Sequence, residues 1–364
     1  MFNQYFSINE AYGVSKSYII FADAIVTSLI GEFEDFVNSE ELEHKSNIII
    51  KYGNLKTYIK DVDLWADFPV KEIKLEYTFK KTPRSEYISK YKRQYEKGIL
   101  YQTTGAAHSF GNKNWSGQYS KIVSPVKRNV EHSIIVDHAY GIEIIKESAK
   151  RVNLRSDKFV TDIRSLVYHE LNHTYETYKK IISSRERGDW KTLRDIGPSV
   201  SLTWADANKW GIPKDIYRKW SLNFGYLIYY MEPHEMRAKV QESAPYAEMY
   251  KSFEKYKKNC PSYDIANDMI DFDTNTFLSE MTDVIIKFDE ESDVDFVLNK
   301  LRNMFLTLYE KNLKVFREET NLDVDKLKSM TIQEFVDFWR KRINNAGEDL
   351  KRRLNNQWYK INNK

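Results

Sequence analysis

The chain of 364 residues contains one cysteine, Cys260, which excludes an intrachain disulfide framework and any zinc or iron–sulfur site built from several cysteines. It also lacks an excess of charge of one sign, because 56 Lys and Arg stand against 53 Asp and Glu, a formal net charge of +3. This balance argues against nucleic acid or anionic lipid as the default partner. Because the chain has a single cysteine, a bound metal would be held by His and carboxylate side chains.

The sequence has no apolar run long enough to cross a membrane. Its most apolar early stretch, residues 18–30, contains Asp23, and the N-terminus has neither the basic region nor the small-residue cleavage site of a secretion signal. We therefore expect a cytoplasmic protein with no membrane partner. Aromatic residues make up 14% of the chain, which excludes disorder as its overall state.

Periodicity along the chain predicts a helix and then a sheet. Apolar residues at helical spacing predict an amphipathic helix over residues 15–37. Between about residues 47 and 139, segments rich in Ile, Val, Tyr and Thr alternate with Gly, Pro and Asn turns. We expect four or five strands there, in NIIIKY, EIKLEYTF, ILYQTT, QYSKIV and HSIIVD.

The last part of the chain has a helical pattern. All eight prolines lie at or before Pro261, and Thr331 with Glu334 forms a capping box ahead of an amphipathic run. The order of helix, sheet and helices predicts an α+β protein, with an N-terminal helix, a mixed β-sheet and a mostly helical C-terminal half. The expected domains are residues 1–255 and 262–364.

Residues 169–173 read HELNH and match the pattern H-E-x-x-H. On a helix, residues four apart project from the same face, so His169 and His173 can present two imidazoles to one Zn²⁺. Glu170 lies about 100° round the helix and can reach a water molecule instead of the metal. We expect this helix at about residues 158–184, with an apolar stripe on one side and the histidines offered on the other. The alternative is a solvated helix face that carries two histidines by chance.

The third ligand is less well marked than the motif, although a catalytic zinc needs three protein groups and one open position. Our candidate is Glu235, in the first turn of a helix predicted at about residues 233–250 and opened by Pro233. The alternative is that Glu235 only complements the helix dipole. Glu176 is expected to orient an imidazole from the same helix face as His169. The rival ligands are Glu232, His234, Asp206 and Glu242.

The segment HELNHTYE, followed some sixty residues later by EPHEMRA, resembles the gluzincin branch of the zincin metallopeptidases. In the general pattern of its sequence, the chain is also similar to uncharacterised H-E-x-x-H proteins encoded by tailed bacteriophages. The resemblance covers about residues 120–250 and implies a zincin-like fold, with an edge strand that aligns an extended substrate at 132–138. It also implies association with a virion if the chain is phage-encoded. Glu235 is not followed by the usual polar partner of the zinc-binding His.

The sequence thus predicts a zinc metalloendopeptidase acting on a protein or peptide. His169, His173 and Glu235 would hold Zn²⁺, and Glu170 would act as general base on the attacking water. The oxyanion donor is left open among Tyr229, Tyr230, His234 and Arg237.

Two alternatives of other classes are kept beside the peptidase. One is a catalytically silent zincin-fold structural or interaction protein, such as a phage particle component. The other is nucleic-acid binding through residues 340–364, which carry eight Lys and Arg against two Asp and Glu. Basic side chains near a helix C-terminus are more often solvated charges favoured by the dipole, so we rank this last.

Overall fold

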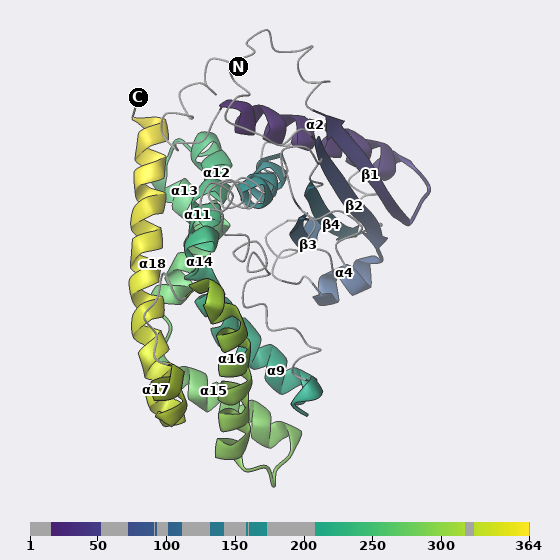
Figure 1. Ribbon diagram of the computed structural model, residues 1–364. Helices are drawn as coiled ribbons and strands as arrows, with labels where there is room; N and C mark the ends of the chain where they lie inside the picture. The colour runs from purple at the N-terminus through teal and green to yellow at the C-terminus, as the bar shows by residue number, and fades with distance from the viewer. Residues whose placement is uncertain are drawn as a thin grey trace, which may run out of the picture. The chain divides into compact units, whose positions relative to one another are not determined.

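The computed structural model describes residues 16–51, 72–90, 92, 101–110, 132–141, 158, 160–172, 208–316 and 324–363 (Figure 1). The chain forms two compact units. The first comprises Met1–Ile181, Gln241–Asn259 and Gln357–Lys364, and the second comprises Ile182–Val240 and Cys260–Asn356. In the described residues the first unit contains the sheet and the second is helical, so the α+β class is confirmed. The boundaries expected at 255 and 262 stay a prediction.

The first unit contains a mixed four-stranded sheet with the order β1-β2-β4-β3. β1 is antiparallel to β2, β2 is parallel to β4, and β3 is antiparallel to β4 with a bulge between Thr103 and Gly105. Four of the five predicted strands are confirmed, and the segment QYSKIV lies outside the described residues. The strands are Glu43–Lys51 (β1), Glu72–Thr82 (β2), Tyr101–Phe110 (β3) and His132–Gly141 (β4).

Strand β4 lies in the interior of the described sheet. Ile135 is aligned with Glu76 of β2 on one side and with Ala107 of β3 on the other. Both backbone edges of β4 are therefore used within the sheet, and the expectation that residues 132–138 form the substrate-aligning edge strand is wrong. Among the described strands, the edges belong to β1 and β3.

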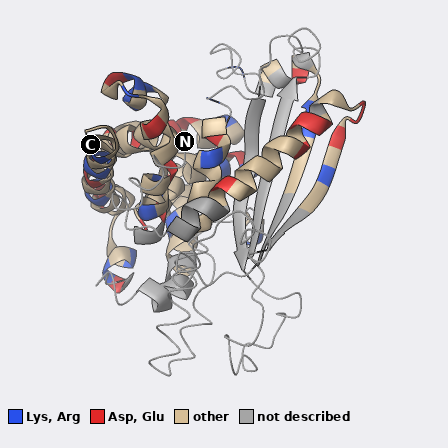
Figure 2. Ribbon diagram, turned by 90° about the horizontal axis from the view of Figure 1, so that it is seen from above, with Lys and Arg blue, Asp and Glu red and all other residues tan. Residues whose placement is uncertain are grey.

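Helix α2 (Lys16–Asn38) covers one face of the sheet and confirms the helix predicted at residues 15–37 (Figures 1 and 2). The ring of Phe33 meets that of Phe79 in β2 edge to face, with centroids 5.1 Å apart. The Tyr77 hydroxyl donates a 2.6 Å hydrogen bond to Glu32. The buried face of α2 consists of Ala22, Ile25, Val26, Leu29, Phe33 and Phe36. Each large apolar side chain buried in this way stabilises the unit by about 1.5–3 kcal/mol. A short helix, α4 (Arg84–Lys90), follows β2.

The chain beyond residue 261 is helical wherever the structure describes it, as predicted. A core of aromatic rings holds the second unit together: Trp220, Phe224, Phe277, Phe305, Phe335 and Trp339. The described part of the second unit contains α9 (Lys214–Trp220), the π turn η4 (Ser221–Gly225), α10 (Tyr226–Tyr230), α14 (Pro261–Ile270), α15 (Thr274–Phe288), α16 (Val294–Phe316) and α17 (Val324–Ser329). Helix α13 (Phe253–Asn259) belongs to the first unit, and α18 (Ile332–Asn362) runs from the second unit into the first. No helix in the described ranges is long and apolar enough to cross a membrane.

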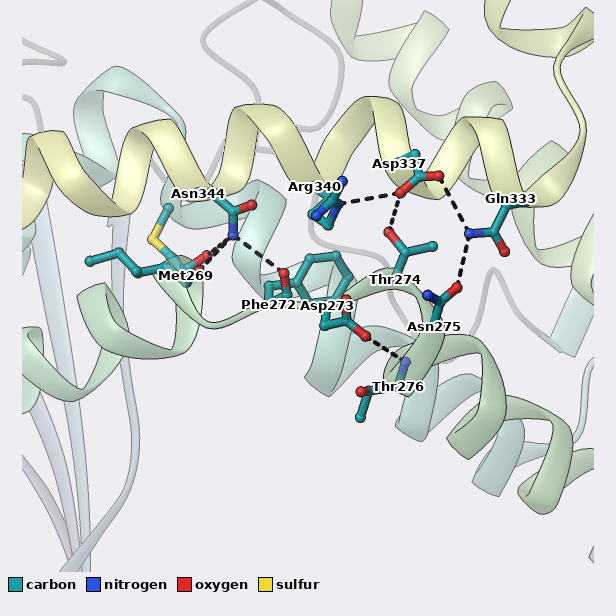
Figure 3. Close-up of polar contacts among 11 residues, drawn as sticks. Met269, Phe272, Asp273, Thr274, Asn275, Thr276, Gln333, Asp337, Arg340 and Asn344 are labelled. Atoms are coloured by element: carbon teal, nitrogen blue, oxygen red, sulfur yellow. Dashed lines mark hydrogen bonds and ion pairs between the residues drawn. The ribbon is translucent and has the colours of Figure 1, made fainter.

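Polar contacts set the start of α18 and its packing on α14. The predicted capping box is confirmed, because Glu334 accepts from the Thr331 amide at 2.8 Å and the Glu334 amide donates to the Thr331 hydroxyl at 3.2 Å. The side-chain amide of Asn344 donates to the backbone carbonyls of Met269 and Ile270, the last two residues of α14, and of Phe272, two residues beyond it (Figure 3). The last carbonyls of a helix have no partner within that helix, so Asn344 acts as a cap supplied from a distant part of the chain.

Candidate metal centre

The H-E-x-x-H motif begins in a helix that the structure describes over residues 160–172; His173 and Glu176 lie outside the described residues. Ile163, Val167 and Leu171 are buried, as the apolar stripe predicts. The opposite face is buried too, since His169 is 8% and Glu170 6% exposed. For the described turns this burial argues against the alternative of a solvated helix face.

The His169 imidazole contacts a carboxylate within the first unit. Its Nδ1 atom lies 2.9 Å from Oε2 of Glu242, and the two side chains are 10% and 11% exposed. One helical turn earlier, the Ser165 hydroxyl donates a 2.8 Å hydrogen bond to the backbone carbonyl of Glu242. Two successive turns of the motif helix thus contact the same residue. If the carboxylate is ionised, Nδ1 must be the donor, which leaves the lone pair of a neutral imidazole on Nε2.

Glu242 makes the contact that was expected of Glu176. Glu242 is one of the rival ligands predicted from the sequence, in which the usual polar partner of the zinc-binding His does not follow Glu235. The sequence feature that could have pointed to Glu242 is its spacing from Glu235. The two residues are seven apart, so on a helix they share one face, two turns from each other. Carboxylates that hold the second nitrogen of a ligating His fix its tautomer and ring orientation.

Glu235 lies in α11 (Pro233–Glu242), which begins at Pro233 as predicted. The helix expected at 233–250 is two helices, because α12 (Ala244–Met249) starts anew after Ser243, and Pro245 has no N–H for the helical ladder. Glu235 is 2% exposed and its Oε2 atom is fully buried. Complementing a helix dipole needs no burial, and burial costs a carboxylate its hydration, so dipole complementation alone does not explain this position.

The remaining candidates divide between buried and surface positions. Glu232 is buried, Arg237 is exposed, and the half-buried rings of Tyr229 and Tyr230 lie 5.5 Å apart. Asp206 lies outside the described residues, as does the side chain of His234. The oxyanion donor therefore stays undecided.

A partly buried ionic cluster anchors the motif helix to its neighbours in the first unit. The Arg164 guanidinium lies 2.9 Å from Glu248 of α12 and 3.4 Å from Asp23 of α2, and it donates to the Tyr168 hydroxyl at 3.2 Å. Burial raises the pKa of Asp23 to about 6, although the charge of Arg164 acts in the opposite direction. Sequence periodicity gives no sign of this cluster, because Asp23 and Glu248 lie far from Arg164 in the chain.

The donor atoms of the two described candidates suit zinc. Zinc takes imidazole nitrogens and carboxylate oxygens, and a ligating imidazole commonly bonds a carboxylate through its other nitrogen. The described residues contain no group of three His, Cys, Asp or Glu positioned to hold a metal ion; the predicted ligand His173 is not among them. His169 belongs to the first unit, and Glu235 to the second.

Comparison with family models, curated proteins and solved structures found no match to the chain.

Proposed function

We propose that the chain is a zinc-dependent metalloendopeptidase with a zincin-like fold, in which His169, His173 and Glu235 hold the metal. The observation that carries the proposal is the buried hydrogen bond between His169 and Glu242. Burying this polar pair costs hydration, and an apolar pair would fill the same space in a helix that served packing alone. A metal-ligating imidazole commonly bonds a carboxylate through the ring nitrogen that does not bind the metal, and the contact between His169 Nδ1 and Glu242 is a contact of that kind.

The chain's own residues would divide the work of hydrolysis among them. Zinc, when bound, would lower the pKa of a water molecule and polarise the scissile carbonyl. Glu170 would take a proton from the attacking water and deliver it to the leaving amine nitrogen. Glu242 would keep the His169 ring in the required tautomer and orientation throughout.

A second candidate is a catalytically silent zincin-fold structural or interaction protein, such as a particle component of a phage. The burial of Glu170 favours this candidate, because a peptide substrate must reach the water that Glu170 activates. The presence of a carboxylate at position 170 favours the peptidase, since a purely structural metal site needs no base next to its ligands.

The variant Glu170→Gln separates the two candidates. We expect wild-type protein loaded with zinc to cleave members of a fluorescence-quenched peptide library, and Glu170→Gln to keep its zinc while cleavage falls by about 10²–10⁴-fold. Glu248→Gln is the matched control, because it changes another carboxylate of the first unit, one that lies outside the motif and accepts a hydrogen bond from Arg164. Cleavage by Glu170→Gln at the wild-type rate would refute the assigned mechanism. A wild type that holds zinc and cleaves no peptide would support the silent candidate.

A further inference from the structure

The last turn of α15 and the first turn of α16 expose three large apolar side chains within a short segment. Ile286, Phe288 and Phe296 are 42%, 59% and 63% exposed. We call residues 286–296 the α15–α16 tip. Isolated exposed apolar residues are common on proteins, but three of them at the adjoining ends of two consecutive helices indicate a contact surface.

The α15–α16 tip is acidic as well as apolar. It carries five carboxylates and only one basic residue, Lys287, so its local charge is −4. The carboxylates are Asp289, Glu290, Glu291, Asp293 and Asp295. Asp289 and Asp293 have local structural roles, because they accept hydrogen bonds from the Ser292 hydroxyl at 2.9 Å and from the Phe296 amide at 3.0 Å. Those roles do not account for the exposed phenyl rings. Two such tips would repel each other, so a matching surface must be basic.

Helix α18 carries a surface with the complementary properties. Phe338, Lys341 and Arg342 follow the spacing of one helix face, and Lys341 and Arg342 are exposed. The Arg342 guanidinium lies 3.9 Å from the centroid of the half-buried Phe338 ring. We call these three residues the α18 face. Basic side chains recur along this helix, which ends at the C label in Figure 2. An aromatic ring flanked by two cations suits exposed phenyl rings flanked by carboxylates.

The tip cannot reach the α18 face of its own chain. The Thr274 hydroxyl, in the first turn of α15, donates a 2.7 Å hydrogen bond to Asp337, which immediately precedes Phe338 (Figure 3). Phe288 ends the same helix fourteen residues later, about 21 Å further along the helix axis. The complementary surfaces of one chain are therefore held apart, and both are accessible to another copy.

We propose that the α15–α16 tip docks on the α18 face of a second copy of the chain, head to tail. The contact joins two different surfaces, so each copy keeps one free tip and one free face and further copies can add. The association is weak because the apolar part consists of three side chains, and it is sensitive to salt because the charges lie at the surface. This inference does not depend on the proposed peptidase function.

Sedimentation velocity on the full chain over a range of concentrations tests the proposal. At an ionic strength of about 0.01 M, where charges act over about 30 Å, we expect the mean mass to rise with concentration. At about 1 M, where that range falls to about 3 Å, the rise should be lost. Leu222→Ser is the matched control, because Leu222 is 52% exposed and lies outside both surfaces.

Two double variants test the head-to-tail geometry directly. Phe288→Ser with Phe296→Ser removes the tip, Lys341→Glu with Arg342→Glu removes the α18 face, and each variant alone should stay monomeric. An equimolar mixture should form dimers and no larger species, since it contains one intact tip and one intact face per pair. Circular dichroism checks that both variants fold. A wild type that is monomeric at every concentration and salt, or a mixture of folded variants that does not dimerise, would overturn the proposal.

Discussion

Replacing Glu242 by Gln removes one charge from the partner of His169 and keeps the side chain's size and an acceptor oxygen. If His169 is a zinc ligand, its imidazole loses the carboxylate that fixes its tautomer and strengthens its basicity. We therefore expect Glu242→Gln to bind zinc more weakly than the wild type while remaining folded.

The expected loss of affinity follows from the burial of the pair. Removing the carboxylate partner of a ligating His typically weakens metal binding about 10–100-fold, or about 1.4–2.7 kcal/mol. His169 and Glu242 are 10% and 11% exposed, so water can replace the lost carboxylate only poorly. We expect a result near the upper end of this range, about 100-fold.

Competition with a chromophoric zinc chelator measures this affinity. Glu248→Gln is the control, since it removes the charge that lies 2.9 Å from the Arg164 guanidinium and leaves His169 untouched. It should unfold at a lower urea concentration than the wild type and bind zinc equally well. A folded Glu242→Gln protein with wild-type zinc affinity would refute the role assigned to this carboxylate.

Three further predictions concern stability and are measured by urea unfolding. In Gly347→Ala, the new Cβ would lie 2.8 Å from the Cβ of Met269, so α14 and α18 would clash. The clash should cost about 1–3 kcal/mol of unfolding free energy and outweigh the gain of about 1 kcal/mol in helix propensity. An unfolding midpoint equal to or above that of the wild type would contradict this. Asn344→Ala leaves three carbonyls without their shared donor and should lower the unfolding free energy by about 1–3 kcal/mol, whereas a wild-type value would show that water replaces the cap. The raised pKa of Asp23, about 6, means that the folded state binds this proton more tightly than the unfolded state does, so wild-type stability should rise as pH falls through 6. Because the side chain is one-third exposed, we expect a gain of about 1 kcal/mol relative to Asp23→Asn, and parallel pH profiles of the two proteins would refute the shift.

Local patterns in the sequence predicted the secondary structure well. The helix at residues 15–37, four strands, the helix starting at Pro233 and the helical tail are all present, because each depends on side-chain periodicity or on proline within a few residues. The position of β4 was missed because strand order depends on pairings between distant segments. An interior strand and an edge strand can have the same alternation of side chains.

The candidate site was predictable only in part for a similar reason. The motif names His169 and Glu170 directly, but the partner of His169 lies 73 residues away. Apolar periodicity revealed the stripe of Ile163, Val167 and Leu171 and could not show that polar contacts to Glu242 cover the opposite face. A helix wheel records which side is apolar; whether the polar side meets water or another helix is decided by tertiary structure.

The zinc content of the purified chain tests the central claim most directly. Elemental analysis would compare the wild type with His169→Ala and Glu235→Ala after exposure to zinc in chelator-free buffer. We predict about one zinc per wild-type chain and its loss in both variants, because a catalytic zinc needs all three protein ligands. Zinc retained by folded Glu235→Ala would move the third ligand to another residue such as Glu232. A folded wild type that takes up no zinc would contradict the metal centre and the peptidase proposed from it.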